Sequence, residues 1–191
     1  MAHRHFLVHK PYGYLSQFVS QAAAEAKKKM LGELHAFPEG TMAIGRLDED
    51  SEGLLLLTTD GNLSEVVRSL QTEKEYYAQV DGLMDDAALA QLRAGVEIGI
   101  QNVRYLTGPC AACRLASAPP FAPRSRKIRD DRHGPTSWVS ITLREGKFRQ
   151  VRKMTAAVGF PTLRLVRVRI GAIELGGLPP GTVQEVAGFA L

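Results

Sequence analysis

The chain has 191 residues, of which 45% are apolar and 23% charged, a balance typical of a protein with one sizeable core. No apolar run approaches the roughly 20 residues that span a bilayer. The N-terminal segment is no signal peptide, because Lys10-Pro11 interrupts a short apolar stretch. Two cysteines are too few for a disulfide framework. We therefore expect a cytoplasmic protein without a membrane partner.

Positive charge gathers in one part of the chain. The net charge is only +4, but residues 124–169 hold thirteen Lys or Arg against three acidic residues. This segment therefore carries +10 and the remainder −6. Such an asymmetry indicates a polyanionic partner, most simply nucleic acid. The alternative, from charge alone, is a solvated basic face without a partner.

Apolar periodicity in the first third of the chain predicts two strands and two helices. The predicted strands cover residues 6–9 and residues 54–57, a run of four leucines. One predicted helix covers the alanine-rich residues 21–34. The other covers residues 62–70, with a core-facing set of Leu63, Val66, Val67 and Leu70. The leucine run has the length and flanks of a strand buried on both faces.

The rest of the chain predicts more strands than helices. Strands are expected at residues 75–80, 137–143 and 161–170, with one or two more in 96–117 and a last one after the turn at Pro179-Pro180-Gly181. Helices are expected at residues 85–94 and in the stretch that Gly159 ends, and residues 118–135 form a loop that closes on a ligand.

The order of these elements predicts the fold class. Strands and helices do not alternate strictly, so we expect an α+β fold with a mixed, mostly antiparallel sheet. The chain then forms one domain of residues 1–191, with two lobes of about residues 1–70 and 71–191.

A polar loop directly before the leucine run holds Asp48 two residues after Arg46. A buried strand holds the loop beside it firmly, and a functional site needs such firm placement of a carboxylate beside a guanidinium. The alternative is an ordinary turn, since turns recruit Asp, Ser and Gly for backbone reasons alone.

The sequence predicts no metal or nucleotide site. His5 and His9 have no evident third ligand, and Cys110-Ala-Ala-Cys113 is a single C-x-x-C without a second pair. There is no glycine-rich phosphate loop. We expect no cofactor.

Four segments of the chain resemble the rRNA pseudouridine synthases of the RsuA type. The longest resembles the catalytic motif of that family and reads Gly45-Arg-Leu-Asp-Glu-Asp-Ser-Glu-Gly-Leu-Leu-Leu-Leu-Thr-Thr-Asp-Gly61. The others resemble three further motifs of the family, in the right order: Lys10-Pro-Tyr-Gly-Tyr-Leu15, Lys74-Glu-Tyr76 and Glu145-Gly-Lys-Phe-Arg-Gln-Val-Arg-Lys-Met154. The resemblance covers nearly the whole chain. It implies the pseudouridine synthase fold, with helices flanking the sheet and a central RNA-binding cleft.

This sequence is similar to a short form of the family. Members usually carry an S4-type RNA-binding domain in front, but here the motifs begin almost at residue 6, so we expect no such domain. The short form implies large-subunit (23S) rRNA as the partner, with the target base flipped from a stem or loop, and a monomeric enzyme. His9 and Phe148 stand where the family often has Asn, which puts RNA contacts at both positions in question.

The resemblance also implies roles for particular residues. Asp48 is the catalytic carboxylate, Arg152 forms a salt bridge with it, and Tyr76 stacks on the uracil or moves a proton. Without the resemblance, core packing is the ordinary reading of a strand Tyr such as Tyr76. Arg46 contacts RNA and holds the flipped uridine. Further RNA contacts are expected at Lys74, Lys147, Arg149, Gln150, Arg126, Lys127 and Arg167, of which Lys74 and Gln150 are the weaker candidates.

The implied reaction breaks the glycosidic bond of a uridine, rotates the uracil and rejoins it through C5. Asp48 would act as a nucleophile or start an elimination through a glycal, and the sequence does not choose between the two routes. Two other functions stay open. One is a non-catalytic RNA-binding factor in ribosome assembly, and the other is the same chemistry on small-subunit rRNA or tRNA.

Overall fold

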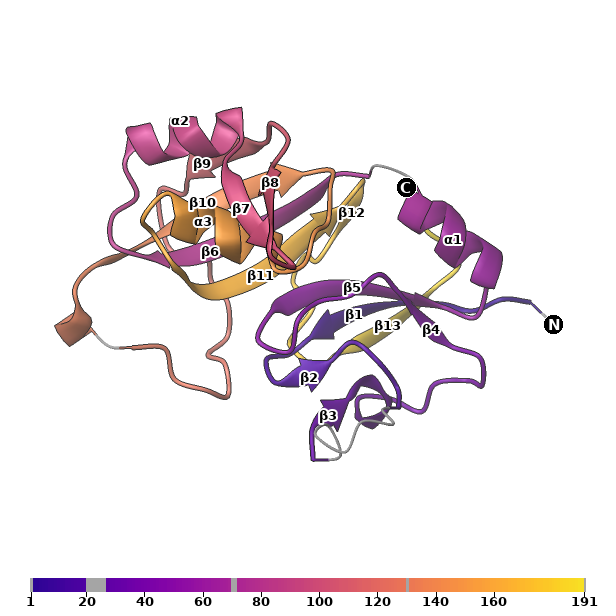
Figure 1. Ribbon diagram of the computed structural model, residues 1–191. Coiled ribbons are helices and arrows are strands. Elements are labelled where there is room, and N and C mark those ends of the chain that lie inside the picture. Colours follow the sequence, from indigo (N-terminus) through magenta and orange to yellow (C-terminus); the bar gives the residue numbers. More distant parts are fainter. Residues whose placement is uncertain (1, 20–26, 70–71, 130, 191) are drawn as a thin grey trace. The chain divides into compact units, whose positions relative to one another are not determined.

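The computed structural model describes residues 2–19, 27–69, 72–129 and 131–190 (Figure 1). The chain divides into two compact units. Unit 1 holds Met1–Thr72, Ala122–Arg126 and Arg167–Leu191, and unit 2 holds Glu73–Phe121 and Lys127–Val166. Residues 122–126 and 167–191 therefore belong to the unit of the N-terminal residues, whereas the sequence predicts a lobe of about residues 71–191.

Unit 1 is built on a β-sheet whose strands are far apart in the chain. Its order is β13 (Val183–Val186), β1 (His5–Lys10) and β5 (Glu52–Thr58), all antiparallel, and β4 (Met42–Ile44) also pairs with β5. Residues 167–170 of β11 (Thr162–Ile170) lie beside β5, and the last two of them, Arg169 and Ile170, pair with the short β12 (Ile173–Glu174). The helix α1 (Gly61–Ser69) and the parallel pair β2 (Tyr14–Leu15) and β3 (Lys29–Met30) complete the unit.

The leucine run forms the centre of the unit 1 core, as the sequence predicts. Every residue of β5 is buried, and all four leucines are fully inaccessible. Leu55 and Leu57 pack with Phe6, Val8 and Leu31 in one cluster. Because successive strand residues point to opposite faces, Leu54 and Leu56 are covered on the other side. Full burial of such side chains contributes roughly 1.5–3 kcal/mol each.

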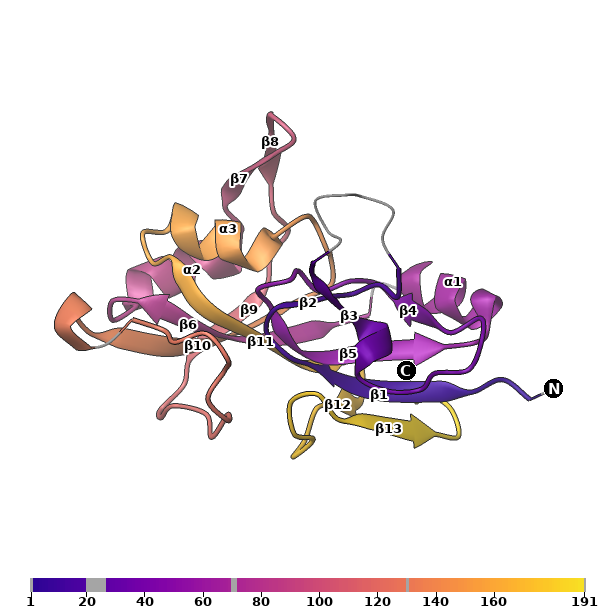
Figure 2. The same cartoon turned by 90° about the horizontal axis from the view of Figure 1, so that it is seen from below.

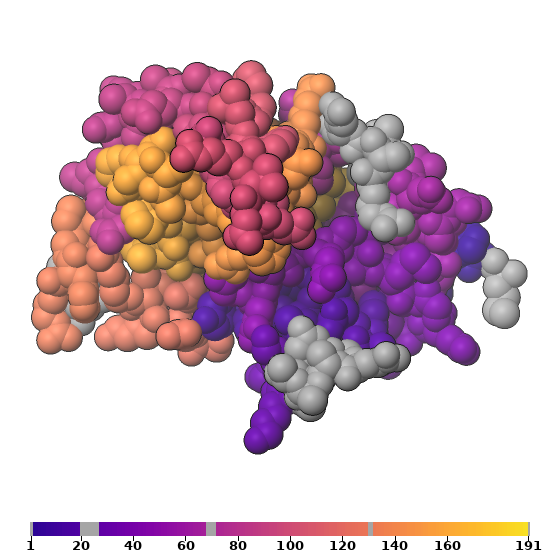
Figure 3. Space-filling view, viewed as in Figure 1, coloured from indigo at the N-terminus to yellow at the C-terminus, as the bar shows by residue number. Residues whose placement is uncertain are grey.

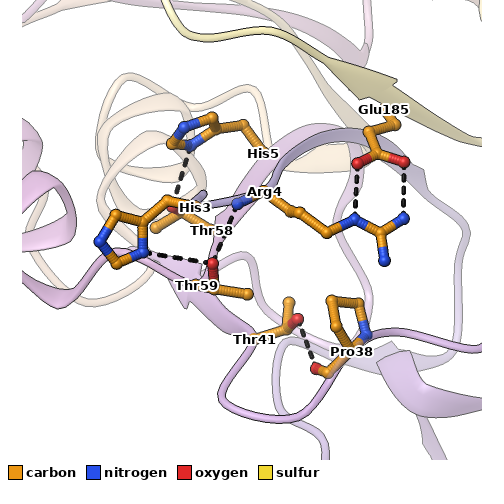
Figure 4. A network of polar contacts seen from close by, with 8 residues as sticks. All are labelled: His3, Arg4, His5, Pro38, Thr41, Thr58, Thr59 and Glu185. Atoms are coloured by element: carbon orange, nitrogen blue, oxygen red, sulfur yellow. Dashed lines mark hydrogen bonds and ion pairs between the residues drawn. The ribbon is translucent and has the colours of Figure 1, made fainter. Parts of the chain in front are cut away.

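Polar contacts fasten the two ends of the chain together beside β1 (Figure 4). The Arg4 guanidinium donates to both carboxylate oxygens of Glu185 in β13, at 2.6 and 2.7 Å. This hydrogen-bonded pairing lowers the pKa of the Glu185 carboxyl. The Arg4 amide donates to Thr59 Oγ1 at 3.0 Å, and the His5 ring lies 3.0 Å from Thr58 Oγ1.

Unit 2 contains a second set of neighbouring strands with helices beside them. Residues 162–166 of β11 are followed by β6 (Lys74–Asp81), β10 (Thr136–Leu143) and β9 (Ala111–Arg114), and the last three are antiparallel. The helix α2 (Asp86–Ala94) contacts β9, and α3 (Gln150–Ala157) contacts the hairpin of β7 (Glu97–Ile100) and β8 (Val103–Leu106). This hairpin projects beyond α3 (Figure 2). A short 3₁₀ helix, Asp131–His133, lies in the long loop before β10.

The α+β prediction with a mostly antiparallel sheet is confirmed, but three local predictions are wrong. Of the predicted helix at 21–34, residues 21–26 lie outside the described residues, and the rest contains β3 and a 3₁₀ helix, Leu31–Glu33. Pairing of Met30 with Leu15 and full burial of Leu31 override the helical propensity. Val66, which the sequence places on the core-facing side of α1, is 51% exposed. Residues 96–117 contain three strands, where the sequence predicts one or two.

Gly53 provides a test of the backbone arrangement at the start of β5. Its φ is +106°, and a Cβ would lie 2.2 Å from the Arg167 carbonyl oxygen. We expect Gly53→Ala to lower the free energy of unfolding by about 3 kcal/mol or more and the Tm by roughly 10 °C. Gly40→Ala is the matched control, because its φ is +79° but no atom lies within 4 Å of the added Cβ. Equal losses in a thermal denaturation series would contradict the close approach.

Candidate active site

Asp48 lies in a loop that is anchored on both sides. Ile44 ends β4 and is buried, Leu47 is buried within the loop, and β5 begins at Glu52. The Ser16 hydroxyl donates to the Leu47 carbonyl at 2.7 Å and accepts from the Leu47 amide at 2.9 Å. The Ser51 amide donates to the Asp48 carbonyl at 3.0 Å, which closes a tight turn. The half-buried Asp48 therefore has a well-defined backbone position.

A buried lysine lies beneath this loop. Lys10 is fully inaccessible, and its Nζ donates to the carbonyls of Tyr14 at 2.6 Å, Pro11 at 3.1 Å and Glu49 at 3.4 Å. The Glu49 carbonyl also accepts from the Gly13 amide at 2.8 Å. Lys10 thus joins the turn after β1 to the loop that carries Asp48. The sequence points to this position only through the Lys-Pro motif, and no site role was expected for Lys10.

Burial also changes the ionisation of Lys10. Loss of solvent lowers the pKa of its ammonium to about 8, against the opposing effect of the nearby carboxylates, among them Glu52, Asp50 and Asp48. The nearby carboxylates therefore stabilise the ammonium, although the effect of burial outweighs theirs.

Arg46 and Asp48 flank the buried Leu47 in the sequence. Arg46 is exposed, and its guanidinium donates to the Gln17 side-chain oxygen at 3.2 Å. Its exposure leaves the guanidinium available to a phosphate or a base, as expected for an RNA contact.

Tyr76 and Arg152 both belong to unit 2, whereas Asp48 belongs to unit 1. Tyr76 is 9% exposed on β6 and pairs across the sheet with Ile141. Arg152 lies half-buried in the first turn of α3, and its Nη1 donates to the Thr162 carbonyl at 3.3 Å. The salt bridge between Arg152 and Asp48 stays a prediction.

The segment before α3 is fixed by a buried polar cluster. The Gln150 side chain, 4% exposed, donates to Glu145 Oε1 at 2.5 Å and accepts from the Lys147 amide at 2.9 Å. Glu145 also accepts from the Tyr105 hydroxyl at 2.5 Å and the Gly108 amide at 2.9 Å. Gln150 therefore supports the segment, and the RNA contact expected at Gln150 stays a prediction.

The other predicted RNA contacts fall into two groups. Arg126, Lys127 and Lys147 are exposed, Arg149 is half-buried, and the half-buried Lys74 donates to the Arg144 carbonyl at 3.3 Å. Arg167, by contrast, is 4% exposed, and its Nε donates to the Leu54 carbonyl at 2.7 Å. This bond ties β11 to the leucine strand, and the RNA contact expected at Arg167 stays a prediction.

The long loop of residues 118–135 is attached at several points within each unit. In unit 2, the Phe121 ring lies 5.8 Å from the Trp138 ring, and Arg129 pairs with Asp81. In unit 1, Arg124 lies 4.6 Å above the Tyr12 ring, and Arg126 donates to the Tyr12 hydroxyl at 3.4 Å. That this loop closes on RNA stays a prediction.

The described ranges, which omit residues 1, 20–26, 70–71, 130 and 191, contain no cluster of three or more His, Cys, Asp or Glu side chains arranged to hold a metal ion. No helix in them has the length and apolarity needed to cross a membrane.

Comparison with known proteins identifies the family of this chain. Residues 4–157 match the family model described as RNA pseudouridylate synthase, and this range includes Asp48, Tyr76 and Arg152. The fold matches a crystal structure of a pseudouridylate synthase with a TM-score of 0.74 and 25% identity, over 97% of this chain and 70% of that one. The chain therefore belongs to the RNA pseudouridylate synthase family, whose enzymes isomerise uridine to pseudouridine.

Among curated proteins, the chain is similar to ribosomal large subunit pseudouridine synthases E. The Xanthomonas campestris protein of that name is 44% identical over 92% of this chain and 91% of its own length. The Vibrio parahaemolyticus protein is 40% identical over 94% of this chain and 72% of its own length. A ribosomal large subunit pseudouridine synthase B from Haemophilus influenzae is 36% identical over 76% of this chain and 36% of its own length.

The buried Lys10 generates a prediction about stability and pH. The unfolded lysine keeps its proton up to its ordinary pKa of 10.5, whereas the folded one loses it near 8. Between these values the unfolded chain binds more protons, so the stability contributed by Lys10 rises with pH. It is lost as the pH falls through about 8.

Denaturant unfolding at pH 7 and pH 10.5 should measure this effect. Relative to Lys10→Met, the wild type should gain about 3 kcal/mol over the interval. When the wild type is compared with Lys74→Met, which removes a half-buried lysine, it should show no such gain. Parallel pH curves for the wild type and Lys10→Met would contradict the buried, titrating ammonium.

Proposed function

We propose that this protein converts a specific uridine of 23S rRNA to pseudouridine, with Asp48 as the catalytic carboxylate. The 44% identity to a large subunit synthase E over about nine tenths of both chains supports the choice of RNA. The single structural observation behind the chemistry is the placement of Asp48, in a tight turn between a fully buried strand and a buried lysine. Such a placement fixes one carboxylate against a substrate that must be moved into position.

Each of the three central residues has a distinct task in this proposal. Asp48 acts at C1′ of the uridine, by direct attack or by starting an elimination, and both routes need the ionised carboxylate. Arg152 pairs with Asp48 and holds the carboxylate in one direction while RNA excludes water. Tyr76 stacks on the uracil, and its hydroxyl can move a proton between the uracil positions.

The exposed cations supply the affinity for RNA. Arg46, Arg126, Lys127 and Lys147 would contact phosphates, and Arg46 would hold the flipped nucleotide out of its stem or loop. All the proposed catalytic groups come from one chain, so a monomer suffices. We expect this monomer to act in the cytoplasm. Binding through these groups should weaken as salt rises.

Mapping of pseudouridine in cells tests the proposed substrate. Total rRNA and tRNA from cells that lack the protein should have lost pseudouridine at one position of 23S rRNA. Wild-type protein should restore that position and Asp48→Asn should not. A lost position in 16S rRNA or tRNA would contradict the substrate. Loss of no position would leave a non-catalytic binding role, and restoration by Asp48→Asn would contradict the role of Asp48.

The proposed Arg152–Asp48 pair predicts a loss of rate that depends on the cation. Without the guanidinium nothing orients the Asp48 carboxylate, so Arg152→Met should lower kcat by roughly 100-fold or more. Arg152→Lys keeps a positive charge and should lose less. The rate of single-turnover conversion measures both variants.

A control for this prediction is available in the same unit. Arg144→Met removes an exposed arginine whose guanidinium pairs with Glu73 at 3.2 Å, and it should leave kcat unchanged. A loss in Arg152→Lys as large as that in Arg152→Met would argue against the ion pair.

A further inference from the structure

A group of half-buried and exposed side chains lies on unit 2, where the segment before α3 meets the β7–β8 hairpin. We name it the α3 rim, and it consists of Val103, Tyr105, Lys147, Phe148 and Lys153. Phe148 is 65% exposed and Val103 66%, whereas Tyr105 and Lys153 are half-buried. The acidic Glu145 lies beside the rim, where it accepts from the Tyr105 hydroxyl. Large apolar groups exposed near cations indicate an interaction surface.

The rim is held firmly in place. Lys153 donates to the Gly99 carbonyl at 2.7 Å, which joins α3 to β7, and its Nζ lies 5.1 Å from the centre of the Phe148 ring. Lys147 Nζ lies 5.0 Å from the centre of the Tyr105 ring. The Tyr105 hydroxyl is fixed by Glu145 at 2.5 Å. Two aromatic rings are therefore each accompanied by a lysine.

The hairpin itself has a defined shape. Its two-residue turn, Gln101 and Asn102, has φ values of 48° and 64°, the left-handed pair that matches the twist of a tight hairpin. The hairpin projects beyond α3 in Figure 2, and its pink surface lies beside the orange surface of the α3 region in Figure 3. The rim is thus a built surface and not a frayed loop.

The chemistry of the rim fits single-stranded RNA better than a protein. Single-stranded nucleic acids are bound by aromatic rings on which bases stack, beside cations that contact the phosphates. The Phe148 ring has most of its area free, and Lys147 and Lys153 stand near the two rings of the rim. A protein partner would have to bury both ammonium groups, and the neighbouring Glu145 carboxylate already accepts from Tyr105, Gly108 and Gln150.

We propose that Phe148 is a base-stacking residue that receives an unpaired nucleotide next to the flipped uridine, with Lys147 and Lys153 on its phosphates. This rests on the proposed function and adds a residue to it. Phe148 precedes Arg152 by four positions in the same unit, so its nucleotide would be close to the target. Stacking tolerates any base, so Phe148 raises affinity for an unpaired strand without selecting its sequence.

The test uses an rRNA fragment that carries the mapped uridine, with both conversion and binding measured. Phe148→Ala should raise KM and Kd by about tenfold and leave kcat unchanged. Phe148→Trp should restore the wild-type values, whereas Phe148→Leu should not, because it keeps an apolar group without a stacking face. Leu83→Ala is the control, since Leu83 is 62% exposed in unit 2 outside the rim.

The salt dependence of binding separates stacking from charge. A plot of log Kd against log salt should keep its slope in Phe148→Ala and become shallower by about one in Lys147→Ala. Wild-type binding by Phe148→Ala, or full rescue by Phe148→Leu, would overturn the inference while leaving the proposed function intact. If the wild type converts no uridine in any RNA, the proposed function itself fails.

Discussion

The position of Asp48 depends on the hydrogen bonds of one buried ammonium group, that of Lys10, beneath the acidic loop. Lys10 gives up solvent to donate to three carbonyl oxygens, and one of them belongs to Glu49, beside Asp48. An ammonium without such partners would be very costly to bury, so the backbone of both turns must adopt the positions that satisfy it. On the other side of the loop, the fully buried β5 resists movement. The carboxylate is therefore positioned by its backbone before any RNA arrives.

The parts of the fold that could be predicted from the sequence are those in which local pattern and tertiary packing agree. Four consecutive leucines between glycine and a Thr-Thr-Asp-Gly turn favour one structure, a strand buried on both faces. In β6, alternation predicts the buried face of Tyr76, Ala78 and Val80. Residues 27–34 show the opposite case, since pairing with β2 and burial of Leu31 decide the structure against the local helical preference.

For the candidate site, motifs predicted the residue types better than their surroundings. Charge counting could not separate the exposed Lys147 from the buried Arg167, because both lie in the same basic segment and only the packing of β11 on β5 distinguishes them. The roles of Lys10 and Phe148 were not predicted for a related reason. A buried ammonium and an exposed phenylalanine both contradict the usual distribution of polar residues to the surface and apolar residues to the core. Such exceptions are concentrated at functional sites.

The most direct measurement of the central claim is release of tritium from C5-labelled uridine in rRNA under single-turnover conditions, because joining the base through C5 must displace that hydrogen. Asp48→Asn should bind the RNA as tightly as the wild type, unfold at the same temperature and release no tritium above the enzyme-free rate. Release by Asp48→Asn at the wild-type rate would contradict the claim that the positioned carboxylate of Asp48 carries out the reaction.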